Sequence, residues 1–193
     1  MESPNAARNL EIVLVHELSS GTFARLYLAE ARAPGGIVRI VAVKILRGDV
    51  SAEPGAVERF TAEARLSASL RHPNTVRVFD FGKTDEGLLY LAMEYLRGTS
   101  LEAVLQLDSR LPPERAARIV AQVCKCLTEA HGRQIVHRDL KPENVHLEAL
   151  PGEPEFARVI DFGIAKFLGG SSQFTASGAI LGTPYYMSPE QVR

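Results

Sequence analysis

The hydrophobic period of this chain changes near residue 97, and this change constrains the fold more than any other feature. Upstream of it, apolar residues fall in short, β-branched and partly alternating segments, which predict strands at 10–18, 25–31, 38–46, 76–81 and 88–95. One segment of helical spacing, 57–70, interrupts them between the breakers Pro54-Gly55 and His72-Pro73. We therefore predict a first lobe made of an antiparallel five-stranded sheet and one helix.

Downstream of residue 97 the apolar spacing is helical. The segment 96–99 is interpreted as a connector, after which Ser100 can cap a short helix that runs to Leu107. Pro112-Pro113-Glu114 opens a longer helix that ends near Gly132, and its apolar stripe is formed by Ala116, Ile119, Val120, Val123, Leu127 and Ala130. The fold is predicted to be α+β and bilobal, with an N-terminal extension at 1–9, a first lobe at 10–96 and a mainly helical second lobe at 97–193.

The composition is that of a globular chain and argues against several classes of partner. Hydrophobic residues make up 46% of the sequence, which is enough for a packed core. The 22 basic and 23 acidic residues give a net charge of −1, so no general basic field favours nucleic acid. The longest uncharged stretch, 167–189, is rich in glycine, serine and threonine, and the N-terminus lacks the pattern of a signal peptide. We expect a cytoplasmic protein with no membrane segment in this chain.

The residue spacing argues against two other kinds of site. Cys124 and Cys126 are two residues apart in a predicted helix and do not face each other, which argues against a disulfide or a zinc site. Gly82-Lys83-Thr84 resembles the end of a P-loop, but Arg77 stands where the first glycine is required.

Five motifs occur in a fixed order along the chain. They are Val41-Ala42-Val43-Lys44, Glu63 nineteen residues later on the predicted helix, the segment 137–144 (His-Arg-Asp-Leu-Lys-Pro-Glu-Asn), Asp161-Phe162-Gly163 and Ser188-Pro189-Glu190. Each motif alone has an ordinary structural explanation, such as a solvated lysine, a glutamate on a solvent-exposed helix face or a simple turn. Together and in this order they resemble the protein kinase family, and the resemblance implies the bilobal kinase fold.

The resemblance implies transfer of a phosphoryl group from ATP with Mg²⁺ as cofactor. That reaction needs the phosphates held and their charge neutralised. Lys44 would contact the α- and β-phosphates, with Glu63 as its ion-pair partner. Asn144 and Asp161 would bind Mg²⁺ through oxygen atoms.

The acceptor side of the reaction is implied in the same way. Asp139 would accept the hydroxyl proton and Lys141 would steady the γ-phosphate. Lys141 and Thr183 are similar to residues of serine/threonine kinases, in which Thr183 would bond the catalytic aspartate and lysine. Protein substrates with serine or threonine acceptors are therefore expected. Thr175 and Ser177 are predicted to be activating sites, phosphorylated by a second kinase molecule and paired with Arg138.

The resemblance also assigns an adenine pocket. Leu18, Leu26 and Ala42 would cover the ring, Met93 would guard the back of the pocket, and Glu94 to Leu96 would form the hinge. Gly21 would lie where the glycine-rich loop comes closest to the phosphates, and His146 would form the pocket floor.

The chain departs from the family pattern at three places. Ser19 and Ala24 replace two glycines of the loop, so we expect a raised KM for ATP. His146 stands where similar kinases have leucine or methionine. The sequence ends at Arg193, before several helices of the family, so an incomplete second lobe is expected, with Ile119, Val123 and Leu127 exposed.

Three functions are therefore compared. The first is a Mg²⁺-ATP-dependent protein serine/threonine kinase, favoured by the intact Lys44, Glu63, Asp139, Asn144 and Asp161. The second is a pseudokinase or inactive fragment that acts as a binding module, favoured by the departures above. The third, a kinase of small molecules, is disfavoured by Thr183 and Pro189-Glu190, which resemble protein-substrate machinery.

Overall fold

The structure is a computed structural model that describes residues 11–162 and 184–192. The described residues group into two compact units, one within 1–52 and 79–95, the other within 53–78 and 96–193. The helix predicted at 57–70 belongs by its contacts to the second unit. The lobe boundaries expected at residues 10 and 97 remain a prediction.

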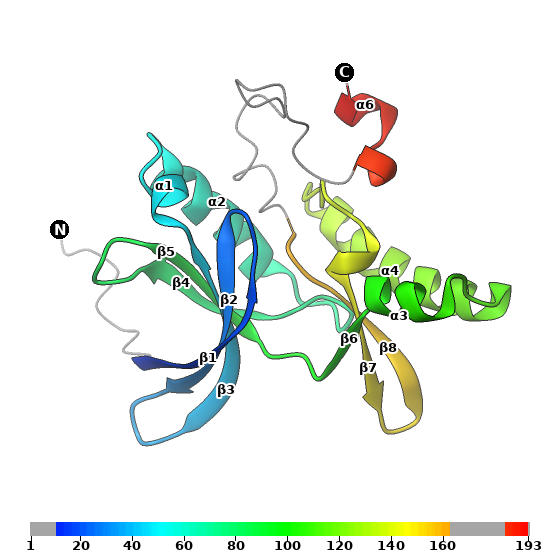
Figure 1. Ribbon diagram of the computed structural model, residues 1–193, viewed down its shortest axis with the longest axis horizontal. Coiled ribbons are helices and arrows are strands. Elements are labelled where there is room, and N and C mark those ends of the chain that lie inside the picture. Colours follow the sequence, from blue (N-terminus) through cyan, green and yellow to red (C-terminus); the bar gives the residue numbers. More distant parts are fainter. Residues whose placement is uncertain (1–10, 163–183, 193) are drawn as a thin grey trace. The chain divides into compact units, whose positions relative to one another are not determined.

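The first unit is an antiparallel five-stranded sheet with the strand order β1-β2-β3-β5-β4 (Figure 1). The strands are β1 (Glu11–Ser20), β2 (Ala24–Arg32), β3 (Val38–Leu46), β4 (Val78–Lys83) and β5 (Leu89–Glu94). Small and β-branched side chains form its core, namely Ala29, Ala31, Val41, Val43 and Ala92. The five predicted strands are confirmed with ends shifted by at most two residues. A one-turn helix that the pattern did not predict, α1 (Gly48–Ser51), follows β3.

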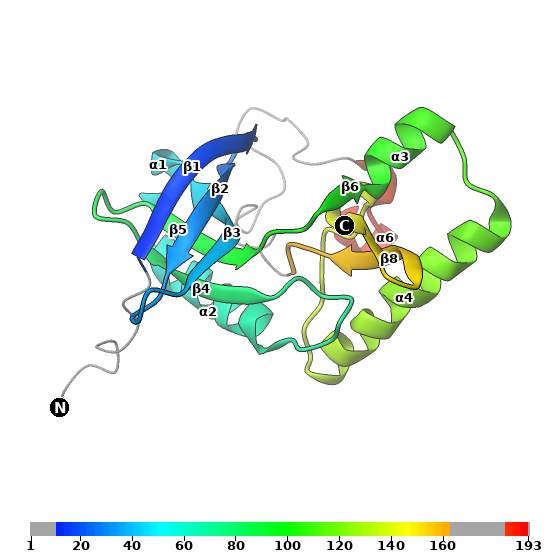
Figure 2. The ribbon, with the colours of Figure 1, turned by 90° about the horizontal axis from the view of Figure 1, so that it is seen from below.

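The second unit combines helices (Figure 2) with a three-stranded sheet of order β6-β7-β8 (Figure 1). Its elements are α2 (Ala56–Ser69), β6 (Gly98–Ser100), α3 (Leu101–Asp108), α4 (Pro113–Gly132), the 3-10 helix η1 (Pro142–Asn144), β7 (Val145–Leu150), β8 (Glu153–Val159), the 3-10 helix η2 (Pro184–Tyr186) and α6 (Pro189–Val192). The cap predicted at Ser100 is present, because its hydroxyl accepts a hydrogen bond of 3.1 Å from the Ala103 amide. The connector predicted at 96–99 is wrong in part, since Gly98 begins a strand.

The apolar stripe of α4 packs on the β7–β8 hairpin. Ile119 and Val123 are buried in one cluster with Val145, Leu147, Ala157 and Val159. The expectation that Ile119, Val123 and Leu127 would be exposed is therefore wrong, because the hairpin covers the first two and Leu127 packs, partly buried, against the same cluster. Val120 was also assigned to the wrong face: it is 57% exposed, and Cys126 takes a place in the core instead.

The close approach of β6 to β7 depends on Gly98. Gly98 lies opposite Glu148 in the register, and a Cβ atom at residue 98 would clash with the Leu147 carbonyl group. Its backbone contact with β7 therefore leaves no room for a side chain.

We predict that Gly98→Ala lowers the free energy of unfolding by about 2 kcal/mol, because one of the two strands must shift. Chemical denaturation would measure the loss. Gly132→Ala is the matched control, since a Cβ atom there meets open space. Equal stability of the two variants would contradict the assignment of Gly98 to a close backbone contact.

The two cysteines of α4 differ in environment. Cys124 is exposed, whereas Cys126 is buried and its thiol donates a hydrogen bond of 3.1 Å to the Val123 carbonyl. Burial raises the pKa of Cys126 to about 11.

We therefore predict that one thiol per chain reacts with a thiol-specific reagent at pH 7.5 under native conditions and that two react in denaturant. Cys124→Ser should abolish the native reaction and Cys126→Ser should leave it intact. A fast native reaction of the Cys124→Ser variant would contradict the buried position of Cys126.

Candidate active site

The strand register of the first unit places four of the predicted nucleotide-binding side chains on one face of the sheet. Lys44 of β3 is paired with Leu26 of β2, and Ala42 is paired with Met93 of β5. Residues 42 and 44 share a face because side chains alternate along a strand. Glu94 is paired with Val41, so its side chain belongs to the opposite face.

The remaining predicted residues of this pocket lie at the ends of strands. Leu18 falls in an irregularity of β1, where the register shifts between Glu17 and Ser19, and it is 37% exposed. Gly21 lies in the β1–β2 turn, which is closed by a hydrogen bond of 2.9 Å from its amide to the Ala24 carbonyl. Leu96 follows β5 and is half-buried.

The two residues that replace glycines in the loop have ordinary strand conformations. Ser19 is paired with Leu26 in β1, and Ala24 is the first residue of β2. Neither is among the described residues with a positive φ angle. Because neither residue has the positive φ angle that favours glycine, a side chain at these two positions adds no backbone strain.

His137 anchors the segment 137–144 from inside the second unit. The ring is 2% exposed and lies 4.7 Å from the Phe162 ring, centroid to centroid. Its Nδ1 accepts a hydrogen bond of 3.3 Å from the Asp139 amide, so the proton resides on Nε2, 2.9 Å from the Ile160 carbonyl oxygen. Burial lowers the pKa of His137, in agreement with this neutral tautomer.

Asp139, Lys141 and Asn144 form one polar cluster. The Asn144 amide nitrogen donates to the Asp139 carbonyl at 2.7 Å and to Asp139 Oδ2 at 3.1 Å. Lys141 Nζ lies 3.4 Å from the same Oδ2. Both amide hydrogens of Asn144 are thereby engaged, and its side-chain oxygen is the atom left to bind a cation.

Two residues that flank this cluster have left-handed backbones. Arg138 has φ 67° and Asp161 has φ 61°. For non-glycine residues such angles cost roughly 1–3 kcal/mol and are concentrated at functional sites. Asp161 follows β8 after one residue, Ile160, whose amide donates a hydrogen bond of 3.0 Å to the Asn144 carbonyl. This bond ties the two predicted Mg²⁺ ligands to one backbone frame.

Glu63 of α2 pairs with the segment 137–144 within the second unit. Its Oε1 lies 3.5 Å from Arg138 Nη1, and its side chain is 16% exposed. Four residues further along α2, the Ser67 hydroxyl donates a hydrogen bond of 2.7 Å to the Phe162 carbonyl. Helix α2 is thus bonded to Arg138, the residue before Asp139, and to Phe162, the residue after Asp161. Lys44, the partner predicted for Glu63, belongs to the first unit.

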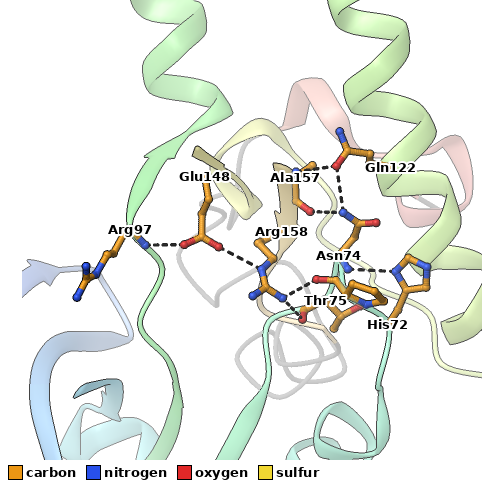
Figure 3. Close-up of polar contacts among 9 residues, drawn as sticks. His72, Asn74, Thr75, Arg97, Gln122, Glu148, Ala157 and Arg158 are labelled. Carbon is orange, nitrogen blue, oxygen red and sulfur yellow. Dashed lines mark hydrogen bonds and ion pairs between the residues drawn. The ribbon is translucent and has the colours of Figure 1, made fainter. Parts of the chain in front are cut away.

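A buried ion pair that sequence reasoning missed supports the same unit (Figure 3). Glu148 of β7 accepts hydrogen bonds from the Arg97 amide at 2.8 Å and from Arg158 Nε at 3.2 Å. Arg158 also donates to the Pro73 and Thr75 carbonyls. The pair therefore joins β7, β8 and the segments that follow α2 and β5. Glutamate and arginine are usually exposed, so periodicity alone gave no signal for it.

A second set of bonds attaches the segment after α2 to α4 (Figure 3). The Asn74 side chain donates to Gln122 at 3.1 Å and to the Ala157 carbonyl at 2.7 Å. Glu129 of α4 accepts a hydrogen bond of 2.7 Å from the His72 amide. The signal was available in the sequence, since His72-Pro73-Asn74 follows a helix, but it was interpreted only as a breaker.

His146 lies in β7, paired with Ser100 of β6 and Arg158 of β8. It is half-buried, and burial lowers the pKa of its ring. The ring is therefore neutral near pH 7 and can present an uncharged flat surface, as the predicted pocket floor requires.

The oxygen donors of the second unit fit Mg²⁺ chemistry. Asn144 and Asp161 supply one amide and one carboxylate oxygen, and Mg²⁺ usually combines such sparse protein ligands with substrate phosphates and water. In the described part of the chain, no group of three His, Cys, Asp or Glu residues forms a complete metal cage. Nor is any described helix long and apolar enough to cross a membrane. Thr183, Thr175, Ser177 and Gly163 lie outside the described residues.

Comparisons with known proteins agree with this arrangement. A family model for the protein kinase domain matches residues 12–193. The serine/threonine-protein kinase pkn3 of Myxococcus xanthus is 43% identical over 158 residues, which are 80% of this chain and 29% of that protein. PrkC of Bacillus subtilis is 37% identical over 180 residues, which are 93% of this chain and 26% of that protein. The chain therefore spans less than a third of these curated relatives.

A solved structure shows the same fold. The crystal structure of the Mycobacterium tuberculosis PknI kinase domain matches with a TM-score of 0.67 and 30% sequence identity. The match covers 79% of this chain and 59% of that one.

The burial of His137 predicts a pH dependence of stability. The pKa of His137 in the folded state lies below the ordinary value of 6.5. At pH values between these two pKa values, the unfolded chain therefore binds more protons than the folded chain. The free energy of unfolding should thus be highest above pH 6.5 and should decline as the pH falls below it. Denaturant titrations at pH 7.5 and pH 5.5 would measure the decline.

His137→Gln removes this titration and should reduce the decline, while His146, shifted in the same direction, retains part of it. His16→Gln, at an exposed position of β1, controls for the change of side chain. A full wild-type decline in His137→Gln would contradict the neutral, buried state of this ring.

Proposed function

Because the chain belongs to the protein kinase family, we propose that it transfers the γ-phosphoryl group of ATP to serine or threonine hydroxyls of proteins. The observation that carries the proposal is the Asp139 cluster, in which Asn144 and Lys141 hold one carboxylate oxygen. Such positioning is what phosphoryl transfer requires from a protein, since little covalent chemistry is left for the side chains.

Asp139 would act on the acceptor hydroxyl. Its Oδ2 is engaged by Asn144 and Lys141, and no described residue donates a hydrogen bond to Oδ1. The side chain is 38% exposed, so an incoming hydroxyl can reach Oδ1. The hydroxyl proton would pass to Asp139 as the oxygen bonds to the γ-phosphorus, and the bond from that phosphorus to the bridging oxygen of ADP would break.

Cations would balance the negative charge of the phosphates. Lys141, whose Nζ is already held beside Asp139, would contact the γ-phosphate. Asn144 and Asp161 would hold Mg²⁺, which when bound supplies charge neutralisation at the phosphates. Lys44 would bind the α- and β-phosphates from the same sheet face as Leu26, Ala42 and Met93, and Glu63 would hold Lys44 in the active state.

The adenine ring would lie on that sheet face. Leu18, Leu26 and Ala42 would cover it, Met93 would close the pocket, and His146 would lie beneath it. The backbone of Glu94 to Leu96 would bind the adenine edge. We place this activity in the cytoplasm, where ATP is abundant.

Regulation would act through Arg138. Its guanidinium is 3.5 Å from Glu63, and a phosphate on Thr175 or Ser177, added by a second kinase molecule, would compete for the same guanidinium. Thr183 would bond Asp139 and Lys141 when a protein substrate is bound. The alternative is a pseudokinase or inactive fragment that acts as a binding module. The ordinary strand backbone of Ser19 and Ala24 favours the catalytic proposal over it.

We predict that Asp139→Asn reduces phosphate transfer to a serine- or threonine-containing protein about 10²–10⁴-fold, since a catalytic base is lost. The measurement is transfer of labelled γ-phosphate, with the ATP-induced shift in melting temperature as a test of intact binding. Asp108→Asn is the matched control, because Asp108 forms an exposed ion pair with Arg115. Equal transfer by the wild type and Asp139→Asn, or none by the wild type, would contradict the proposal.

A further inference from the structure

The β1–β2 turn is bonded by a side chain from the far end of β3. Arg47 directly follows β3, and its Nε and Nη2 donate hydrogen bonds of 3.1 and 3.0 Å to the Gly21 carbonyl. Nη2 also lies 3.3 Å from the Ser20 hydroxyl oxygen. The two segments are 26 residues apart in sequence, and all of these groups belong to the first unit.

The backbone of Arg47 reinforces this attachment. Its amide donates a hydrogen bond of 2.9 Å to the Phe23 carbonyl. Within the turn itself, the Gly21 amide bonds the Ala24 carbonyl. The turn 20–24 therefore has the Gly21–Ala24 bond within it and four bonds from Arg47, three of which depend on the guanidinium.

We propose that Arg47 is a positioning residue that holds the β1–β2 turn in the conformation that receives the phosphates of ATP. The inference rests on the proposed kinase function and extends it to a residue outside the five motifs. Arg47 lies three residues after Lys44, so the strand that carries Lys44 and the turn that would cover the phosphates are joined into one body.

The physical benefit comes from ordering the turn before the ligand arrives. A mobile loop loses conformational entropy when it closes on a ligand, and a loop that is already held loses less. The two hydrogen bonds from the Arg47 guanidinium also direct the Gly21 carbonyl toward that cation, which keeps the carbonyl oxygen from facing an anionic phosphate. A chain that retains only the middle glycine of its loop can use such an external attachment.

The geometry of the Arg47 hydrogen bonds distinguishes a positioning role from simple electrostatic attraction of phosphate. Two nitrogens of one guanidinium share the Gly21 carbonyl, and the ammonium of lysine cannot reproduce this planar fork. Arg47→Lys keeps the positive charge near the turn but loses the fork, whereas Arg47→Ala loses both. If Arg47 acted only by attracting phosphate, lysine would replace it.

The test combines hydrogen exchange in the nucleotide-free chain with binding of two ligands. We expect both Arg47 variants to speed amide exchange in residues 20–24 and to weaken binding of Mg²⁺-ATP about tenfold. Binding of adenosine, which has no phosphates to meet the turn, should stay at the wild-type level. Arg32→Ala is the matched control, because Arg32 forms an exposed ion pair at the opposite end of β2.

Three outcomes would overturn the inference: unchanged exchange in Arg47→Ala, wild-type ATP affinity in Arg47→Lys, or an equal loss of ATP and adenosine binding. Absence of ATP binding by the wild-type chain would instead contradict the proposed function and the nucleotide part of this inference. The exchange measurement would still decide whether Arg47 holds the turn.

Discussion

The double hydrogen bond from the Asn144 side chain to Asp139 is the interaction on which the candidate site depends. One amide nitrogen reaches both the backbone carbonyl and the carboxylate of Asp139, and it thereby closes the segment between them into a compact loop. Asn144 is buried, so leaving this amide without partners would cost the desolvation free energy of a polar group. The same bonds that satisfy a buried group also set the direction of the carboxylate.

Buried polar groups, in addition to apolar packing, connect this loop and its neighbours to the surrounding structure. His137 links the loop to Ile160 and to the Phe162 ring, and Glu148 with Arg158 binds the neighbouring strands to the segment after α2. A buried ion pair gives little net stability, but removal of one partner is costly. Such a network therefore favours one arrangement of β7, β8 and the loops beside them over other compact arrangements.

The first unit is specified in a different way. Alternation of buried and exposed side chains is enough to set the register between β2, β3 and β5, because a shift by one residue would expose the side chains that must be buried. That register brings Lys44, Leu26, Ala42 and Met93 to one face of the sheet. The β1–β2 turn differs from the sheet, because side-chain and backbone hydrogen bonds from Arg47 join it to the end of β3.

The five strands, the two long helices and the family could be predicted from the amino-acid sequence, because hydrophobic period, breakers and ordered motifs are local signals. It also identified Asp139, Lys141 and Asn144, which are close in sequence and meet within one loop. Only the tertiary structure decided that Val120 faces outward, that β7 and β8 cover the stripe of α4, and that Glu148, Arg158 and Arg47 find their partners. Most of those partners are far apart in sequence, and the charge of a side chain does not reveal which distant carbonyl it will meet. Contacts of that kind form only when the backbone brings both segments together, so no local pattern encodes them.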